Sequence, residues 1–89
     1  MSIKEKLLDR LFHRQDTFTW DNAVTLFKSL GCQTKEGRGS RVKIIFTGEN
    51  RSLTLSIHRP HTNSKMGQGR IRAICDYIIE VLEEQEETT

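Results

Sequence analysis

The segment SIHRPH, residues 56–61, places two histidines and an arginine around the only proline of the chain. An unperturbed histidine titrates near neutrality and can therefore give or take a proton in catalysis. Arginine adds a permanent positive charge that stabilises charge developing on a phosphate. Two histidines beside basic residues can cleave RNA without metal, by activating the ribose 2′-hydroxyl against the neighbouring phosphate. The alternative is that His58 and His61 are surface polar residues with no catalytic role.

Basic residues are concentrated in the middle of the sequence. Between positions 38 and 72 the chain has eight basic residues and one acidic residue, a net charge of +7 over 35 residues. The basic residues are Arg38, Arg41, Lys43, Arg51, Arg59, Lys65, Arg70 and Arg72, and the acid is Glu49. Such a segment indicates a surface for a polyanion such as a nucleic acid. The alternative is an ordinary solvated face, because lysine and arginine are normally exposed.

Composition narrows the class of protein. The chain has 89 residues, which predicts a single domain with a modest core. No apolar run is long enough for a transmembrane helix, and the charged N-terminus lacks the apolar block of a signal peptide, so we expect a cytoplasmic protein. Cys32 and Cys75 show no zinc-site spacing and are expected to be reduced and structural. No carboxylate cluster suits a two-metal nuclease, and no metal or small-molecule cofactor is expected.

Hydrophobic periodicity predicts three helices. Ile3, Leu7, Leu8 and Leu11 recur at helical spacing and predict an amphipathic helix over about 3–13. Thr19 is the expected N-cap of a second helix, which Gly31 ends. A last helix is expected over about 69–84, after a loop rich in turn-forming residues.

Three segments between the second and third helices alternate with a period of two. They are 32–36, 41–47 and 52–58, and they predict an antiparallel sheet whose apolar face alone is covered by helices. The predicted fold class is α+β, with an α-β-β-β-α core and an additional N-terminal helix. We divide the single domain 1–89 into a helical extension at 1–16, a core at 17–84 and an acidic tail at 85–89.

The same alternation predicts on which face of the strand 52–58 the side chain of His58 lies. His58 shares a strand face with Ser52, Thr54 and Ser56, opposite the apolar residues of that strand. If the strands 41–47 and 52–58 pair, Arg41 and Lys43 lie on the same uncovered face. His61 follows just beyond the strand end, so the basic residues and both histidines are expected to converge on this face and its rim.

Three segments in order resemble the HicA family of bacterial toxins. They are FTWDNAVTLFKSLG, GRGSRVKIIF and LSIHRPHTNSKM, followed by an amphipathic helix, and the resemblance covers about residues 18–82. The resemblance implies a small ribosome-independent mRNA interferase with a fold similar to the double-stranded-RNA-binding domain. It also implies a HicB-type antitoxin protein that covers the active surface and holds the toxin inactive.

One family feature is missing. The usual catalytic histidine follows the GS dipeptide closely, but here that position holds Arg41, with no histidine near it. Arginine cannot replace histidine as a general base, because its guanidinium stays protonated. The second family histidine, in the loop after the last strand, is matched by His61, and His58 is an additional candidate.

The sequence therefore gives one leading hypothesis and two alternatives. The leading hypothesis is a metal-independent endoribonuclease that degrades mRNA and inhibits translation, with His61 as first acid/base candidate and His58 as second. The RNA-binding candidates are Arg38, Arg41, Lys43, Arg59, Lys65, Arg70 and Arg72. The alternatives are a non-catalytic RNA-binding module and a protein-interaction domain, each using the same basic face.

Overall fold

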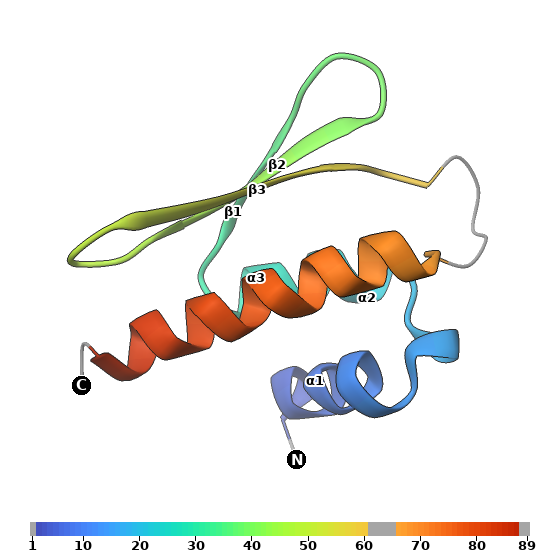
Figure 1. The fold of residues 1–89 in the computed structure, drawn as a ribbon, viewed down its shortest axis with the longest axis horizontal. Helices are drawn as coiled ribbons and strands as arrows, with labels where there is room; N and C mark the ends of the chain where they lie inside the picture. The colour runs from blue at the N-terminus through green and yellow to red at the C-terminus, as the bar shows by residue number, and fades with distance from the viewer. Residues whose placement is uncertain (1, 61–65, 88–89) are drawn as a thin grey trace.

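The computed structural model describes residues 2–60 and 66–87 and shows an α+β chain with a three-stranded antiparallel sheet (Figure 1). This confirms the predicted fold class. The elements are α1 (Ile3–His13), a short 3₁₀ helix η1 (Gln15–Thr17), α2 (Trp20–Ser29), β1 (Gln33–Glu36), β2 (Arg41–Thr47), β3 (Ser52–His58) and α3 (Gln68–Glu87).

The first two helices begin at side-chain caps. Ser2 accepts a hydrogen bond from the backbone N–H of Glu5, and α1 spans the residues predicted for it. Thr19 and Asn22 form a capping box, in which each side chain accepts from the backbone N–H of the other residue at 3.2 Å. Gly31, with a φ of 82°, stands just beyond α2 in the left-handed conformation that glycine adopts without strain. The predicted cap and the predicted end are both confirmed.

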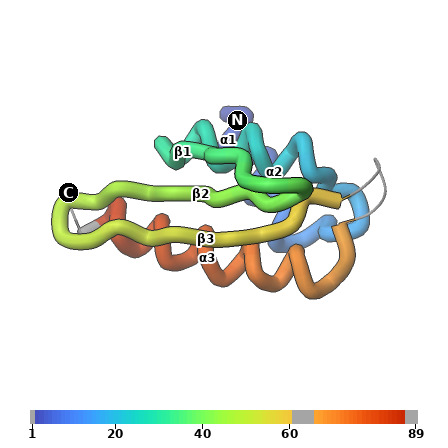
Figure 2. Tube along the Cα trace, turned by 90° about the horizontal axis from the view of Figure 1, so that it is seen from above, coloured from blue at the N-terminus to red at the C-terminus, as the bar shows by residue number. Residues whose placement is uncertain are grey.

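The sheet has the strand order β1-β2-β3, with both pairs antiparallel. Along β2, Val42, Ile44 and Phe46 are buried, whereas the alternate residues are exposed or half-buried. Along β3, Leu53 and Ile57 are buried on the same face. Helices α2 and α3 lie against this apolar face, α1 lies beyond them on the same side of the sheet, and the opposite face of the sheet carries no helix (Figures 1 and 2).

The N-terminal helix contributes to the core. Leu7 and Leu11 are buried in one cluster with residues of α2, the sheet and α3. The backbone carbonyl of Leu11 also lies 3.9 Å from the Cys75 thiol of α3. Helix α1 therefore covers the side of α2 and α3 that faces away from the sheet (Figure 1).

Helix α3 is longer than predicted, 68–87 instead of 69–84, and two of its polar side chains bond to the sheet and its hairpin. The Tyr77 hydroxyl lies 2.8 Å from the Leu53 carbonyl and 3.2 Å from the Ile44 carbonyl, both buried. The Glu84 carboxylate, 2% exposed, accepts from Arg51 Nε at 3.1 Å. These contacts hold the β2–β3 hairpin on α3 and leave the opposite face of the sheet uncovered.

Candidate nucleic-acid interface

The uncovered face of the sheet carries basic side chains in register. Lys35 of β1 pairs with Lys43 of β2, which pairs with Ser56 of β3. One step along the same face, Arg41 pairs directly with His58. Directly paired residues of antiparallel strands project from the same face with Cβ atoms about 4.5–5.5 Å apart. The sheet thus places three cations and one histidine together, all of them exposed to solvent.

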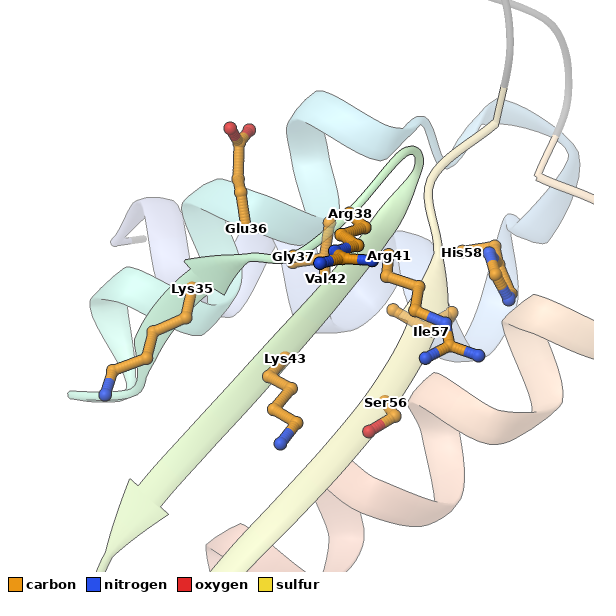
Figure 3. A pocket seen from close by; sticks show the side chains of 10 residues that line it. All are labelled: Lys35, Glu36, Gly37, Arg38, Arg41, Val42, Lys43, Ser56, Ile57 and His58. Atoms are coloured by element: carbon orange, nitrogen blue, oxygen red, sulfur yellow. The ribbon is translucent and has the colours of Figure 1, made fainter.

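These side chains border a hollow of about 650 Å³ (Figure 3). The lining residues are Lys35, Glu36, Gly37, Arg38, Arg41, Val42, Lys43, Ser56, Ile57 and His58. Four of the ten are lysine or arginine, and Glu36 is the only acid. A phosphate entering the hollow would therefore meet a strongly positive site with a proton-transfer group at its edge.

The β1–β2 turn brings Arg38 to this hollow. The turn closes with hydrogen bonds from Gly37 N–H to the Arg41 carbonyl at 2.8 Å and from Arg41 N–H to the Arg38 carbonyl at 3.2 Å. Gly39 has a φ of 63°, a conformation that glycine tolerates and most residues do not. The glycine-rich sequence GRGS therefore forms a tight turn that holds Arg38 beside β2.

His58, the last residue of β3, is held at its backbone and at its ring. Its carbonyl accepts from Arg70 Nε of α3 at 2.7 Å. Its ring atom Nδ1 lies 3.1 Å from Ser40 Oγ in the β1–β2 turn. Ser40 is itself fixed, because its carbonyl accepts from Arg59 N–H at 2.9 Å. The imidazole therefore has a defined place at the edge of the hollow.

Two of the predicted RNA-binding residues have partners within the protein. Arg59 Nη1 donates to Glu36 Oε1 at 2.8 Å and forms an ion pair with side chains 40% and 71% exposed. Arg70 donates to the carbonyls of His58 and Met66, at 2.7 Å and 3.2 Å. Arg59 thus links the end of β3 to β1, and Arg70 fastens the two ends of the segment between β3 and α3.

The remaining predicted residues do not all join the hollow. Arg38, Arg41, Lys43 and His58 line it, whereas Arg72 lines a separate groove between η1 and α3, with Gln15 and Asp76. His61 and Lys65 lie outside the described residues.

Sequence reasoning missed Lys35 and Ser40. Lys35 lies on the uncovered face because it pairs with Lys43, and the alternation of the short strand 32–36 was the available signal. Ser40 is visible in the sequence only as part of a turn and of the GS dipeptide. Its contact with His58 joins residues 18 apart and depends on how the turn meets the end of β3.

The two cysteines are not suited to nucleophilic chemistry. Burial raises the pKa of the Cys32 thiol, and burial together with the neighbouring Asp76 carboxylate raises the pKa of the Cys75 thiol. Both are free thiols. A raised pKa keeps a thiol protonated and therefore weakly reactive.

Among residues 2–60 and 66–87, no group of three or more His, Cys, Asp or Glu side chains is placed to hold a metal ion. In the same part of the chain, no helix combines the length and the apolar character needed to cross a membrane. Comparisons of the chain with family models, with curated proteins and with solved structures gave no match.

Proposed function

We propose that this chain is a metal-independent endoribonuclease, an mRNA interferase that inhibits translation as the toxin of a toxin–antitoxin pair. The observation that carries the proposal is the hollow on the uncovered sheet face, which is lined by Lys35, Arg38, Arg41 and Lys43 and has His58 at its edge (Figure 3). This combination supplies phosphate binding and proton transfer in one place. The resemblance to the HicA family supports the same function.

In the proposed reaction the ribose 2′-oxygen attacks the adjacent phosphorus atom, and the bond from phosphorus to the 5′-oxygen breaks. One histidine takes the proton of the 2′-hydroxyl, and the other gives a proton to the departing 5′-oxygen. The products are a 2′,3′-cyclic phosphate and a 5′-hydroxyl. His58 and His61 are the two proton-transfer candidates, and Arg41 and Lys43 stabilise the charge on the phosphoryl oxygens.

The register of β2 and β3 supports a catalytic role for His58 despite the arginine at position 41. Arg41 and His58 are direct cross-strand partners on the same face. A histidine at 58 therefore reaches nearly the same space as one at 41, about 5 Å away across the ladder. In this proposal, His58 on β3 transfers the proton in place of a histidine at position 41 on β2, and Arg41 binds phosphate.

The proposed partner is an acidic HicB-type antitoxin that covers the basic hollow, and the proposed place of action is the cytoplasm. An acidic protein surface and an RNA backbone would compete for the same cations. Binding of the antitoxin would then block access of mRNA to His58 without any change in the fold of the toxin.

The decisive experiment is cleavage of an mRNA by the purified full chain in the presence of EDTA, with His58→Ala and His61→Ala beside the wild type. We expect cleavage by the wild type, products with cyclic phosphate ends, and a loss of at least about 100-fold in each variant. Ser52→Ala is the control, because Ser52 lies at the far end of the same strand face.

RNA binding measured in parallel separates the alternatives. Retained binding with lost cleavage in a variant assigns the acid/base residue. A wild type that binds RNA but never cuts it would identify a non-catalytic RNA-binding module. A wild type that neither binds nor cuts RNA would leave the protein-interaction domain as the function of the basic face.

A further inference from the structure

We propose that Ser40 is a positioning residue for His58, and that Nε2 of His58 is the atom that exchanges a proton with RNA. The inference rests on the proposed function for its catalytic part. The contact between Ser40 Oγ and His58 Nδ1, 3.1 Å, carries its geometric part. No other side-chain bond engages the His58 ring among the described residues, so Nε2 is the ring nitrogen open to a ligand.

Both residues of this contact are anchored independently of it. Ser40 belongs to the tight β1–β2 turn, and its carbonyl is held by the N–H of Arg59 at 2.9 Å. The backbone of His58 is paired to Arg41 in the sheet and held by Arg70 from α3. With both backbones fixed, the hydrogen bond between the side chains restrains how the imidazole is turned.

The chemistry selects one direction for this hydrogen bond. A base acting through Nε2 needs a lone pair there, so the proton of the neutral ring must sit on Nδ1. Ser40 Oγ then accepts from Nδ1–H. After Nε2 takes up a proton, Nδ1–H still donates to the same oxygen, so the bond persists through both protonation states. The opposite direction, with Ser40 donating, would place the proton on Nε2 and remove its capacity as a base.

The surroundings of the ring agree with Ser40 as the acceptor. Three residues that adjoin His58 are cationic: Arg41 is its partner across the ladder, Arg59 follows it in sequence, and Arg70 donates to its carbonyl. The only acid lining the hollow, Glu36, is paired with Arg59. Among the described residues no carboxylate bonds to Nδ1, and Ser40 fills the place that a carboxylate takes in many catalytic histidine pairs.

The first test reads the tautomer directly. Long-range proton–nitrogen NMR of the ¹⁵N-labelled full chain distinguishes Nδ1–H from Nε2–H in neutral imidazoles, and His58→Gln assigns the signal among the three histidines. We expect the Nδ1–H form for His58 in the wild type and in Ser40→Thr, which keeps the hydroxyl. We expect Ser40→Ala to shift the ring toward Nε2–H. An Nε2–H ring in the wild type would overturn the proposal.

The second test measures cleavage. Ser40→Ala should lower kcat by about five- to tenfold, the equivalent of one lost hydrogen bond, with KM unchanged. Ser40→Thr should recover most of the rate, and Ser52→Ala should match the wild type. In a His58→Ala background, Ser40→Ala should have no further effect.

The two tests together distinguish a failure of the proposed role of Ser40 from a failure of the proposed function. A wild type that cleaves RNA but holds His58 as Nε2–H would overturn the role of Ser40 and leave the proposed function standing. A wild type that does not cleave RNA would overturn the proposed function and the catalytic role of Ser40 together, whereas the tautomer would still show whether Ser40 orients the ring.

Discussion

The salt dependence of RNA binding should reveal how many of the basic residues take part. Four cations line the hollow: Lys35, Arg38, Arg41 and Lys43. Each phosphate neutralised on a single strand adds about −0.7 to the slope of log K against log salt, so four give a slope of about −2.8. Between 50 and 200 mM salt, the affinity should then fall about 50-fold.

The seven RNA-binding residues proposed from the sequence alone would give a steeper salt dependence. If all seven contacted RNA, the slope would be about −4.9 and the affinity would fall about 900-fold over the same range. The structure favours the smaller number, because Arg59 is paired with Glu36, Arg70 binds two carbonyls, and Arg72 lies in a separate groove.

Fluorescence anisotropy with a 2′-O-methyl RNA measures binding without cleavage. Lys43→Gln should reduce the slope by about 0.7, and Arg72→Gln should leave it unchanged. Participation of Lys65, outside the described residues, would bring the slope to about −3.5. A slope steeper than about −4.2, or a large effect of Arg72→Gln, would refute the assignment of binding to the hollow.

Three further predictions concern stability. Tyr77→Phe should lower the free energy of unfolding by about 1–2 kcal/mol, the value of one hydrogen bond, because the single hydroxyl proton can bond to only one of the two buried carbonyls at a time. An unchanged midpoint of the unfolding transition in urea would contradict this. Burial raises the pKa of the Tyr77 hydroxyl above its ordinary value of 10.0, so the stability that the protonated hydroxyl contributes is complete below pH 10 and is lost as the pH rises further. Tyr77 is the only tyrosine of the sequence, so the absorbance of tyrosinate should rise only as the protein unfolds, and ionisation of Tyr77 before unfolding would refute this expectation. Gly48→Ala should lower the free energy of unfolding by about 1–3 kcal/mol, since the added Cβ would lie 2.8 Å from Glu84 Cγ. Gly69→Ala in α3 should raise the free energy of unfolding by about 0.5–1 kcal/mol, because the added Cβ meets nothing within 4 Å. Equal melting temperatures of the two variants would contradict both expectations.

The sequence predicted the face of each strand residue because side chains on a strand alternate strictly. The alternation alone therefore places Arg41, Lys43 and His58 on the uncovered face, and the register confirms this placement. The caps were also predictable, since Thr19 and Gly31 act through local backbone geometry. These features depend on residues that are close in the sequence.

Contacts between distant residues could not be predicted in the same way. The sequence indicates Arg59 and Arg70 as RNA-binding residues because both are basic and near the histidines. Their partners, Glu36 and the His58 carbonyl, are 23 and 12 residues away in sequence. Helical spacing likewise indicated an apolar stripe on α3 but not the direction of Tyr77, whose partners are backbone carbonyls of two strands.

The division of the basic residues suggests how the site keeps its shape. Arg59 and Arg70 fix the end of β3 through an ion pair and two carbonyls, and both therefore act on the backbone that carries His58. Lys35, Arg38, Arg41 and Lys43 have no ion-pair partner among the described residues, and all four line the hollow. Replacing Arg70 should therefore disturb the placement of His58, whereas replacing Lys35, which has no role in the proposed chemical step, should weaken phosphate binding alone. Kinetics distinguish the two residues: the loss of Arg70 should lower kcat, and the loss of Lys35 should raise KM.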